Sequence, residues 1–170
     1  MPITTYGQND WEIIIPLATT NMVSDPSLEI DTTGWLASGG ATTIARSSLF
    51  QYFGVYSLQV NVDSNTTAGT RYGDISLTSG ITYTASVFFK GALAIPYRLF
   101  IANTSNAAVS SIVTFTGTGQ WQRLEVAYTE TSSTTRRVFV TKNTSADVTA
   151  FYVDGLQVEA QSEASTYCDG

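Results

Sequence analysis

The feature that most constrains this chain is a succession of short segments in which apolar and polar residues alternate. Segments rich in Val, Ile, Thr, Tyr and Phe recur about every dozen residues, with Gly, Asn, Ser and Thr between them. Alternation with period two turns one side of a strand toward a core and the other toward solvent. No stretch shows the 3.6-residue period of a helix. The sequence therefore predicts an all-β, antiparallel β-sandwich of the jelly-roll type.

Parity along these segments assigns each side chain to a face. The expected strands cover residues 41–47, 55–62, 71–77, 81–90, 96–102, 109–115, 121–129 and 136–142, with a pair of strands within 149–160. The residues expected to point inward are Tyr83, Ala85, Val87, Phe89, Tyr97, Leu99, Ile101, Leu124, Val126, Tyr128, Val138 and Val140. Three aromatic residues and two arginines have the opposite parity: Phe88, Phe100, Phe139, Arg98 and Arg137.

Composition excludes many functions. The 170 residues include no His, 8 Lys+Arg and 14 Asp+Glu, for a net charge of −6. Without His there is no Ser-His-Asp triad and no His-ligated zinc, and the lone Cys168 cannot form an internal disulfide. An acidic balance disfavours nucleic acid, and no apolar run reaches the roughly 20 residues of a membrane span. We expect no nucleic-acid partner and no membrane insertion.

The two ends of the chain are expected to differ from its middle. Residues 1–19 do not follow the alternation and are interpreted as an N-terminal arm. The jelly-roll domain is expected over residues 20–167, and residues 168–170 form a C-terminal end from which a longer natural chain could continue. The N-terminus lacks a basic region, and the first positive residue is Arg46, so no secretory signal is expected.

Several segments resemble a known family. The opening N-M-V-S-D-P-S-L-E-I-D-T-T-G-W (21–35) resembles the "Asn-x-x-x-Asn-x-x-Phe-Glu … Gly-Trp" opening of jelly-roll carbohydrate-binding modules of families 4, 9 and 22. The segments G-Q-W-Q-R-L-E-V-A-Y-T (119–129) and F-Y-V-D-G-L-Q-V-E-A-Q-S-E-A-S-T-Y (151–167) resemble these modules as found in phage tail and minor structural proteins. The segment S-G-I-T-Y-T-A-S-V-F-F-K-G (79–91) fits the same pattern. Leu28 departs from it, because an aromatic residue is usual there.

The resemblance implies a calcium site. First and last strands pair in a jelly roll, which would bring Glu29 toward Asp154, and the resembling modules use these two positions as calcium ligands. Asp25 could add a carbonyl or a side chain. Ca²⁺ takes such hard oxygen ligands, and here it would be structural. The alternative is that these carboxylates cap turns or accept backbone N–H groups.

A sugar-binding surface is expected from aromatic and planar polar side chains. Flat rings stack on sugar faces, and guanidinium or amide groups bond the hydroxyls. The outward residues Phe88, Arg98, Phe100, Arg137 and Phe139 would form such a patch on one sheet. The alternative is that the three phenylalanines are buried under the N-terminal arm or a neighbouring subunit.

A second aromatic cluster is expected after the loop near residue 50. It comprises Gln51, Tyr52, Phe53 and Tyr56 and is expected near Arg71 and Tyr72. Trp35 and Trp121, which fall within the resembling segments, are expected in the core or at its rim.

The resemblance implies a virion structural protein on a phage tail or capsid surface. Its jelly roll would serve assembly, attachment to a host glycan, or both, as a homo-oligomer in contact with other virion proteins. The alternative is an extracellular carbohydrate-binding module, free or appended to an enzyme, that binds a polysaccharide. No enzymatic activity is expected, because only Glu125 and Asp74 could form the carboxylate pair of a glycosidase, and nothing brings them together.

Overall fold

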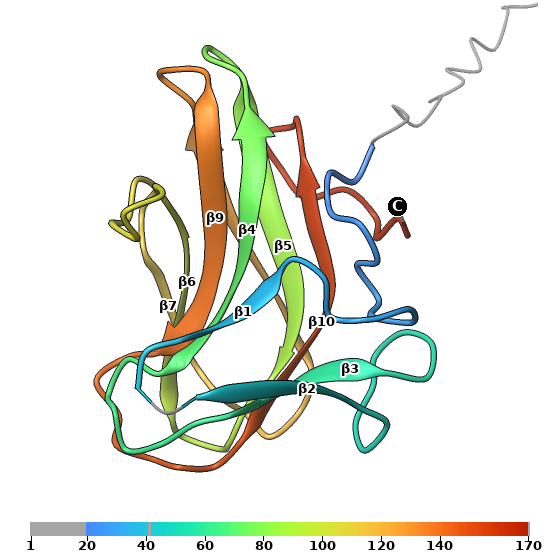
Figure 1. Ribbon diagram of the computed structural model, residues 1–170, viewed down its shortest axis with the longest axis vertical. Helices are drawn as coiled ribbons and strands as arrows, with labels where there is room; N and C mark the ends of the chain where they lie inside the picture. Colours follow the sequence, from blue (N-terminus) through green and yellow to red (C-terminus); the bar gives the residue numbers. More distant parts are fainter. Residues whose placement is uncertain (1–19, 41, 170) are drawn as a thin grey trace, which may run out of the picture.

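The computed structural model describes residues 20–40 and 42–169, which form two five-stranded antiparallel sheets packed face to face (Figure 1). Sheet A has the strand order β1-β4-β9-β6-β7, and sheet B has the order β2-β3-β10-β5-β8. The predicted antiparallel β-sandwich is confirmed. The strands are β1 (Trp35–Ser38), β2 (Thr43–Ser47), β3 (Ser57–Asn61), β4 (Gly69–Leu77), β5 (Thr82–Lys90), β6 (Pro96–Ala102), β7 (Val113–Thr116), β8 (Gln122–Thr129), β9 (Thr134–Lys142) and β10 (Phe151–Glu159).

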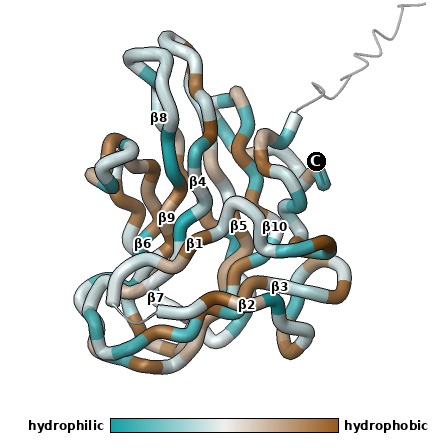
Figure 2. Tube along the Cα trace, in the orientation of Figure 1, coloured by the Kyte–Doolittle hydropathy of each residue, from teal (hydrophilic) through white to brown (hydrophobic). Residues whose placement is uncertain are grey.

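The core between the sheets contains the side chains that alternation assigns inward. Phe89 and Tyr97 lie there in contact, with ring centroids 4.6 Å apart, and both are fully buried. Figure 2 shows hydrophobic and hydrophilic residues following one another within single strands, as a half-buried sheet requires. Leu124 and Tyr128 are only half-buried against the core, near the sandwich edge. The predicted residues in the core are Tyr83, Ala85, Val87, Phe89, Tyr97, Leu99, Ile101, Val126, Val138 and Val140.

The strand boundaries differ from the prediction in three places. Residues 149–160 hold one strand, β10, and not a pair. The Asp154–Gly155 step looks like a turn in the sequence, but it is a bulge in the pairing with β5, and Gly155 adopts φ 56° there. β1 was not predicted, and β7 is shorter than the expected strand at 109–115.

The opening and closing segments of the chain meet beside β10. Asn21 donates its Nδ2 to the carbonyls of Leu156 (3.1 Å) and Cys168 (3.2 Å). The Asn21 Oδ1 accepts the N–H of Val158 at 3.0 Å. In Figure 1 the blue opening segment and the dark red closing segment lie side by side. Two of the segments that carry the family resemblance are therefore joined by one buried side chain.

The expected N-terminal arm, residues 1–19, lies outside the described residues, as does Gly170. The division into arm, domain and C-terminal end stays a prediction. Within the described ranges, no helix is long and apolar enough to cross a membrane.

A buried ion pair joins the turn after β8 to β9. Arg136 donates from Nε and Nη2 to the two carboxylate oxygens of Glu130, each at 2.7 Å. Glu130 also accepts the N–H groups of Thr131 and Ser132. Burial raises the pKa of Glu130, but the Arg136 and backbone hydrogen bonds outweigh it and hold that pKa below its ordinary value. The carboxylate is thus ionised and fully bonded.

Glu130→Gln is expected to destabilise the fold by about 3–5 kcal/mol, because it leaves the Arg136 charge buried without a counterion. The matched control is Asp74→Asn, which removes the ion pair with Arg137, where the Asp74 side chain is 63% exposed. That change should cost at most about 1 kcal/mol. Urea denaturation measures both, and equal losses would contradict the assignment.

The Glu130 contribution should also depend on pH. Because the folded pKa is lowered, the stabilisation is present above the ordinary value of 4.5 and is lost as the pH falls through the folded pKa. The stability difference between wild type and Glu130→Gln should therefore shrink below pH 4.5.

Candidate functional site

The outer face of sheet B is covered by the chain itself. Its polar side chains Thr84, Gln157 and Glu159 are at most 1% exposed. Thr84 donates its hydroxyl to the carbonyl of Gln161, and Glu159 accepts the N–H of Ser165 at 2.7 Å. The segment after β10 therefore lies across the part of this face that β5 and β10 form.

A cluster of aromatic rings completes the cover of sheet B. Tyr52 stacks on Phe88 with ring centroids 4.0 Å apart, and Phe53 stacks on Tyr167 at 3.9 Å. Trp121 meets the edge of Tyr52 at 5.8 Å and is half-buried at the rim. The contacts bury Phe88 and leave Tyr52 47% exposed.

The prediction that Phe88 shares a sheet with Phe100 and Phe139 is wrong. Phe88 belongs to β5 in sheet B, whereas Phe100 and Phe139 belong to β6 and β9 in sheet A. Parity tells only that a side chain points away from the core, and both sheets have such a face. All three rings point outward, but from opposite sides of the sandwich.

The prediction that Tyr52 and Tyr56 lie near Arg71 is also wrong. Tyr52 lies on sheet B, and Tyr56 packs against Arg46, whose guanidinium lies 3.9 Å from its ring centroid. Arg71 is in β4 of sheet A. The Arg46 contact, which the sequence did not suggest, ties β2 to the opening segment through a bond to the carbonyl of Glu29 at 2.6 Å.

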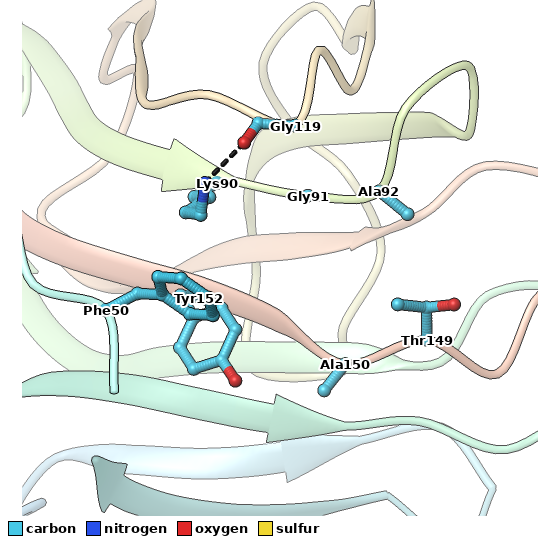
Figure 3. A pocket seen from close by; sticks show the side chains of 8 residues that line it. All are labelled: Phe50, Lys90, Gly91, Ala92, Gly119, Thr149, Ala150 and Tyr152. Carbon is cyan, nitrogen blue, oxygen red and sulfur yellow. Dashed lines mark hydrogen bonds between the residues drawn. The ribbon is translucent and has the colours of Figure 1, made fainter. Parts of the chain in front are cut away.

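A pocket of about 260 Å³ opens beside the ends of β5 and β10 (Figure 3). Phe50 and Tyr152 form an aromatic corner with ring centroids 5.0 Å apart. Lys90 donates its ammonium group to the Gly119 carbonyl and lies 4.9 Å from the Phe50 ring centroid. The lysine is thus already engaged, and the pocket is smaller than the roughly 300 Å³ at which small-molecule sites begin.

Glu29 and Asp154 both accept backbone N–H groups from the segment 52–56. The predicted pairing of the first and last strands does not occur, because β1 pairs with β4 in sheet A and β10 lies in sheet B. Asp154 is fully buried; its Oδ2 accepts the N–H groups of Tyr52 and Phe53, and its Oδ1 is buried with no hydrogen-bond partner in the described chain. Burial raises the pKa of Asp154 to about 6, and the negative charge of Glu29 adds to the rise. Glu29 itself accepts the N–H groups of residues 55 and 56.

The unpartnered Asp154 oxygen beside a second carboxylate fits a hard cation such as Ca²⁺. Asp25 serves another purpose: its carboxylate accepts the N–H groups of Glu29, Ile30 and Asp31 and closes a turn. No cluster of three acidic or other metal-ligating side chains occurs in the part of the chain that the structure describes. A cation at Glu29 and Asp154 would therefore need carbonyl or water oxygens as further ligands.

The outer face of sheet A carries a stacked aromatic pair. Phe100 and Phe139 are register partners on β6 and β9, with ring centroids 5.0 Å apart and an interplanar angle of 10°. They form a cluster separate from the main core, and each is about 95% buried. The rings are therefore the base of this face and not exposed platforms.

Three arginines surround this pair. Arg98 lies with its guanidinium 5.2 Å from the Phe100 ring and donates to the Thr141 hydroxyl at 2.9 Å. Arg137 bonds Asp74 at 3.0 Å. Arg71 is the register partner of Phe139, and its Nη1 is buried without a hydrogen-bond partner among the described residues. The structure thus brings Arg71, Arg98 and Arg137 to one surface, which we call the arginine face.

The remaining predicted residues have other positions. Trp35 is buried in the core against Tyr72, with ring centroids 5.5 Å apart. Glu125 lies on β8 in sheet B and Asp74 on β4 in sheet A, so the sandwich separates these two carboxylates.

These features define a class of protein: a β-sandwich module with one sheet partly covered by its own chain and the other carrying three arginines on its outer face. A family model for the carbohydrate-binding domain, CBM_4_9, matches residues 20–147. The chain belongs to this family of carbohydrate-binding domains. Comparison with curated proteins finds no significant match.

Solved structures share the fold at low sequence identity. The CBM22-1 xylan-binding domain of Xyn10C from Paenibacillus barcinonensis has a TM-score of 0.64 and 19% identity, covering 86% of this chain and 98% of that one. The C-terminal family 22 module of Clostridium thermocellum Xyn10B has a TM-score of 0.60 and 23% identity, covering 81% and 92%. Tailspike protein 4 of bacteriophage CBA120 has a TM-score of 0.62 and 11% identity, covering 81% and 21%. At these identities the likeness concerns the fold alone.

Proposed function

We propose that this domain is a non-catalytic module that binds a polysaccharide through the arginine face of sheet A. The observation that carries the proposal is the gathering of three half-buried arginines on the outer face of sheet A, around the Phe100–Phe139 pair. Membership of the carbohydrate-binding family and a fold shared with xylan-binding domains support a glycan ligand. Xylan is therefore the first polysaccharide to test.

The face has the groups that recognise sugar hydroxyls. A guanidinium presents five N–H donors in a fixed plane, and Arg98 uses one of them for Thr141. Thr114, the register partner of Arg98 on β7, is exposed and adds a hydroxyl. Sheet B offers fewer free hydrogen-bonding groups to a sugar, because the C-terminal segment already binds polar side chains of its outer face.

Arg98→Ala is expected to weaken xylan binding by about tenfold, because one charged hydrogen bond to the ligand is lost. Arg123→Ala is the matched control, since Arg123 lies on sheet B above Phe88, 5.5 Å from the ring centroid. Affinity electrophoresis or calorimetry measures both. If only the Arg123 variant lost affinity, the binding face would be sheet B.

We further propose that Glu29 and Asp154 hold a structural calcium ion. The support is the buried Asp154 Oδ1, which has no hydrogen-bond partner in the described chain and which a cation would satisfy. Calcium would supply a positive charge beside Asp154, whose pKa is raised by burial and by the negative charge of Glu29. It would thereby fix the turn after the opening segment against β10 without taking part in sugar contacts.

Calcium should raise the melting temperature of the wild type, and a chelator should reverse the rise, because a ligand that binds only the folded state stabilises it. Asp154→Asn and Glu29→Gln should each abolish the calcium response. Glu125→Gln, which neutralises an exposed carboxylate on β8, should keep it. A response that survives both of the first two substitutions would refute this site.

A virion role is the second candidate. Its support is the resemblance of the closing segments to phage tail proteins, together with the shared fold in a bacteriophage tailspike. In that case the module would sit in a homo-oligomer, with its open face available for a host glycan.

The molar mass in solution tests this candidate. A homo-oligomer that becomes monomeric when residues 1–19 are deleted would support an assembly role. A monomer in both forms would favour the independent polysaccharide-binding module.

A further inference from the structure

The arginine face has a charge opposite to that of the chain. The protein carries a net charge of −6, yet the described side chains on the outer face of sheet A include three arginines and one aspartate, Asp74. Asp74 is also the only acidic partner that any of the three finds among residues 20–40 and 42–169. The face is therefore a local centre of positive charge on an acidic molecule, which favours anionic ligands.

A bulge in β4 shapes the centre of this face. The register with β9 shifts between Tyr72 and Ile75, so that two residues of β4, Gly73 and Asp74, lie opposite one residue of β9, Arg137. Such bulges redirect side chains and occur next to binding sites. Here the bulge brings the Asp74 carboxylate to Arg137 and leaves a glycine between two arginines.

Gly73 lies beneath two converging guanidinium groups. A Cβ atom added to Gly73 would lie 2.9 Å from Arg71 Nη1 and 3.6 Å from Arg137 Nε. The two cations therefore meet over a residue without a side chain. Burial, and next the charge of Arg137, lower the pKa of Arg71, which shows that the like charges repel. An anion bound between them would relieve this repulsion.

We propose that Arg71 and Arg137 over Gly73 bind a carboxylate of the ligand, so that the polysaccharide of this module carries uronic acid residues. The inference rests on the proposed function and names its ligand class. A planar carboxylate matches the paired N–H donors of a guanidinium, and such pairs are the strong form of the hydrogen bond. Neutral sugars would meet the same donors but would not neutralise the charge.

Asp74 is a built-in competitor for this site. Its Oδ1 accepts from Arg137 Nε at 3.0 Å, while the rest of the side chain is exposed to solvent. Arg137 Nη1 is anchored separately, by the Thr104 carbonyl and the Asn106 side chain. Removal of the Asp74 charge should therefore free Arg137 Nε for the ligand without displacing the arginine.

The test uses two forms of one polymer: a xylan with glucuronic acid side groups, and the same xylan after reduction of its carboxyl groups to alcohols. The wild type should bind the acidic form about tenfold or more tightly, and salt should narrow the difference. Arg71→Gln should abolish the preference for the acidic xylan. Arg71→Lys keeps the positive charge but lacks the planar guanidinium, so it should retain only part of that preference. Arg123→Gln, which removes the same charge from sheet B, should keep the preference.

The Asp74→Asn variant distinguishes loss of the site from misfolding, because its expected effect is a gain of affinity. This variant should bind the acidic xylan more tightly than the wild type, and a misfolded protein cannot gain affinity. If Asp74→Asn binds no better, or if both forms of the xylan bind the wild type equally, the carboxylate site is wrong while polysaccharide binding stands. If dextran sulfate displaces the acidic xylan more readily than a polyuronate does, the site prefers sulfate to carboxylate, and the proposal also fails. If neither xylan binds and no other polysaccharide does, the proposed function fails with it.

Discussion

The strand β10 is buried on both of its faces, and the rest of the molecule is arranged to make that possible. All nine of its residues are buried, although Asp154, Gln157 and Glu159 are polar. Each of these side chains must find hydrogen-bond partners away from water. The partners come from the loop after β2 and from the segment after β10, which therefore pack on the outer face of sheet B.

This cover makes the two sides of the sandwich unequal. The part of sheet B that β5 and β10 form is covered by stacked aromatic rings and by the segment after β10, so its polar side chains are hydrogen-bonded within the chain. On sheet A the Arg98 guanidinium lies over the Phe100 ring, and the side chains of Arg71 and Arg98 are half-buried. The asymmetry explains why one face can be used for recognition while the other maintains the fold.

The two proposed sites are consequently independent of each other. Glu29 and Asp154 lie with sheet B, and the arginine face lies on sheet A, with the apolar core between them. A cation at the first site would act on the folding equilibrium through β10. An anionic sugar at the arginine face would contact residues of β4 and β9, where charge and hydrogen bonding determine which ligand binds.

The sequence by itself determined the fold class and most of the residues that face the core. Alternation is a local property of each strand, and the opening and closing segments resemble a family in which they meet. It could not determine to which sheet a strand belongs, so Phe88 was grouped with Phe100 and Phe139. Arg71 and Arg137 lie 66 positions apart in a chain of 170 residues, and only the pairing of β4 with β9 brings them together. That pairing depends on long-range packing and on a bulge, neither of which leaves a local pattern, and for this reason only the tertiary structure shows that the arginines of the proposed binding face lie together.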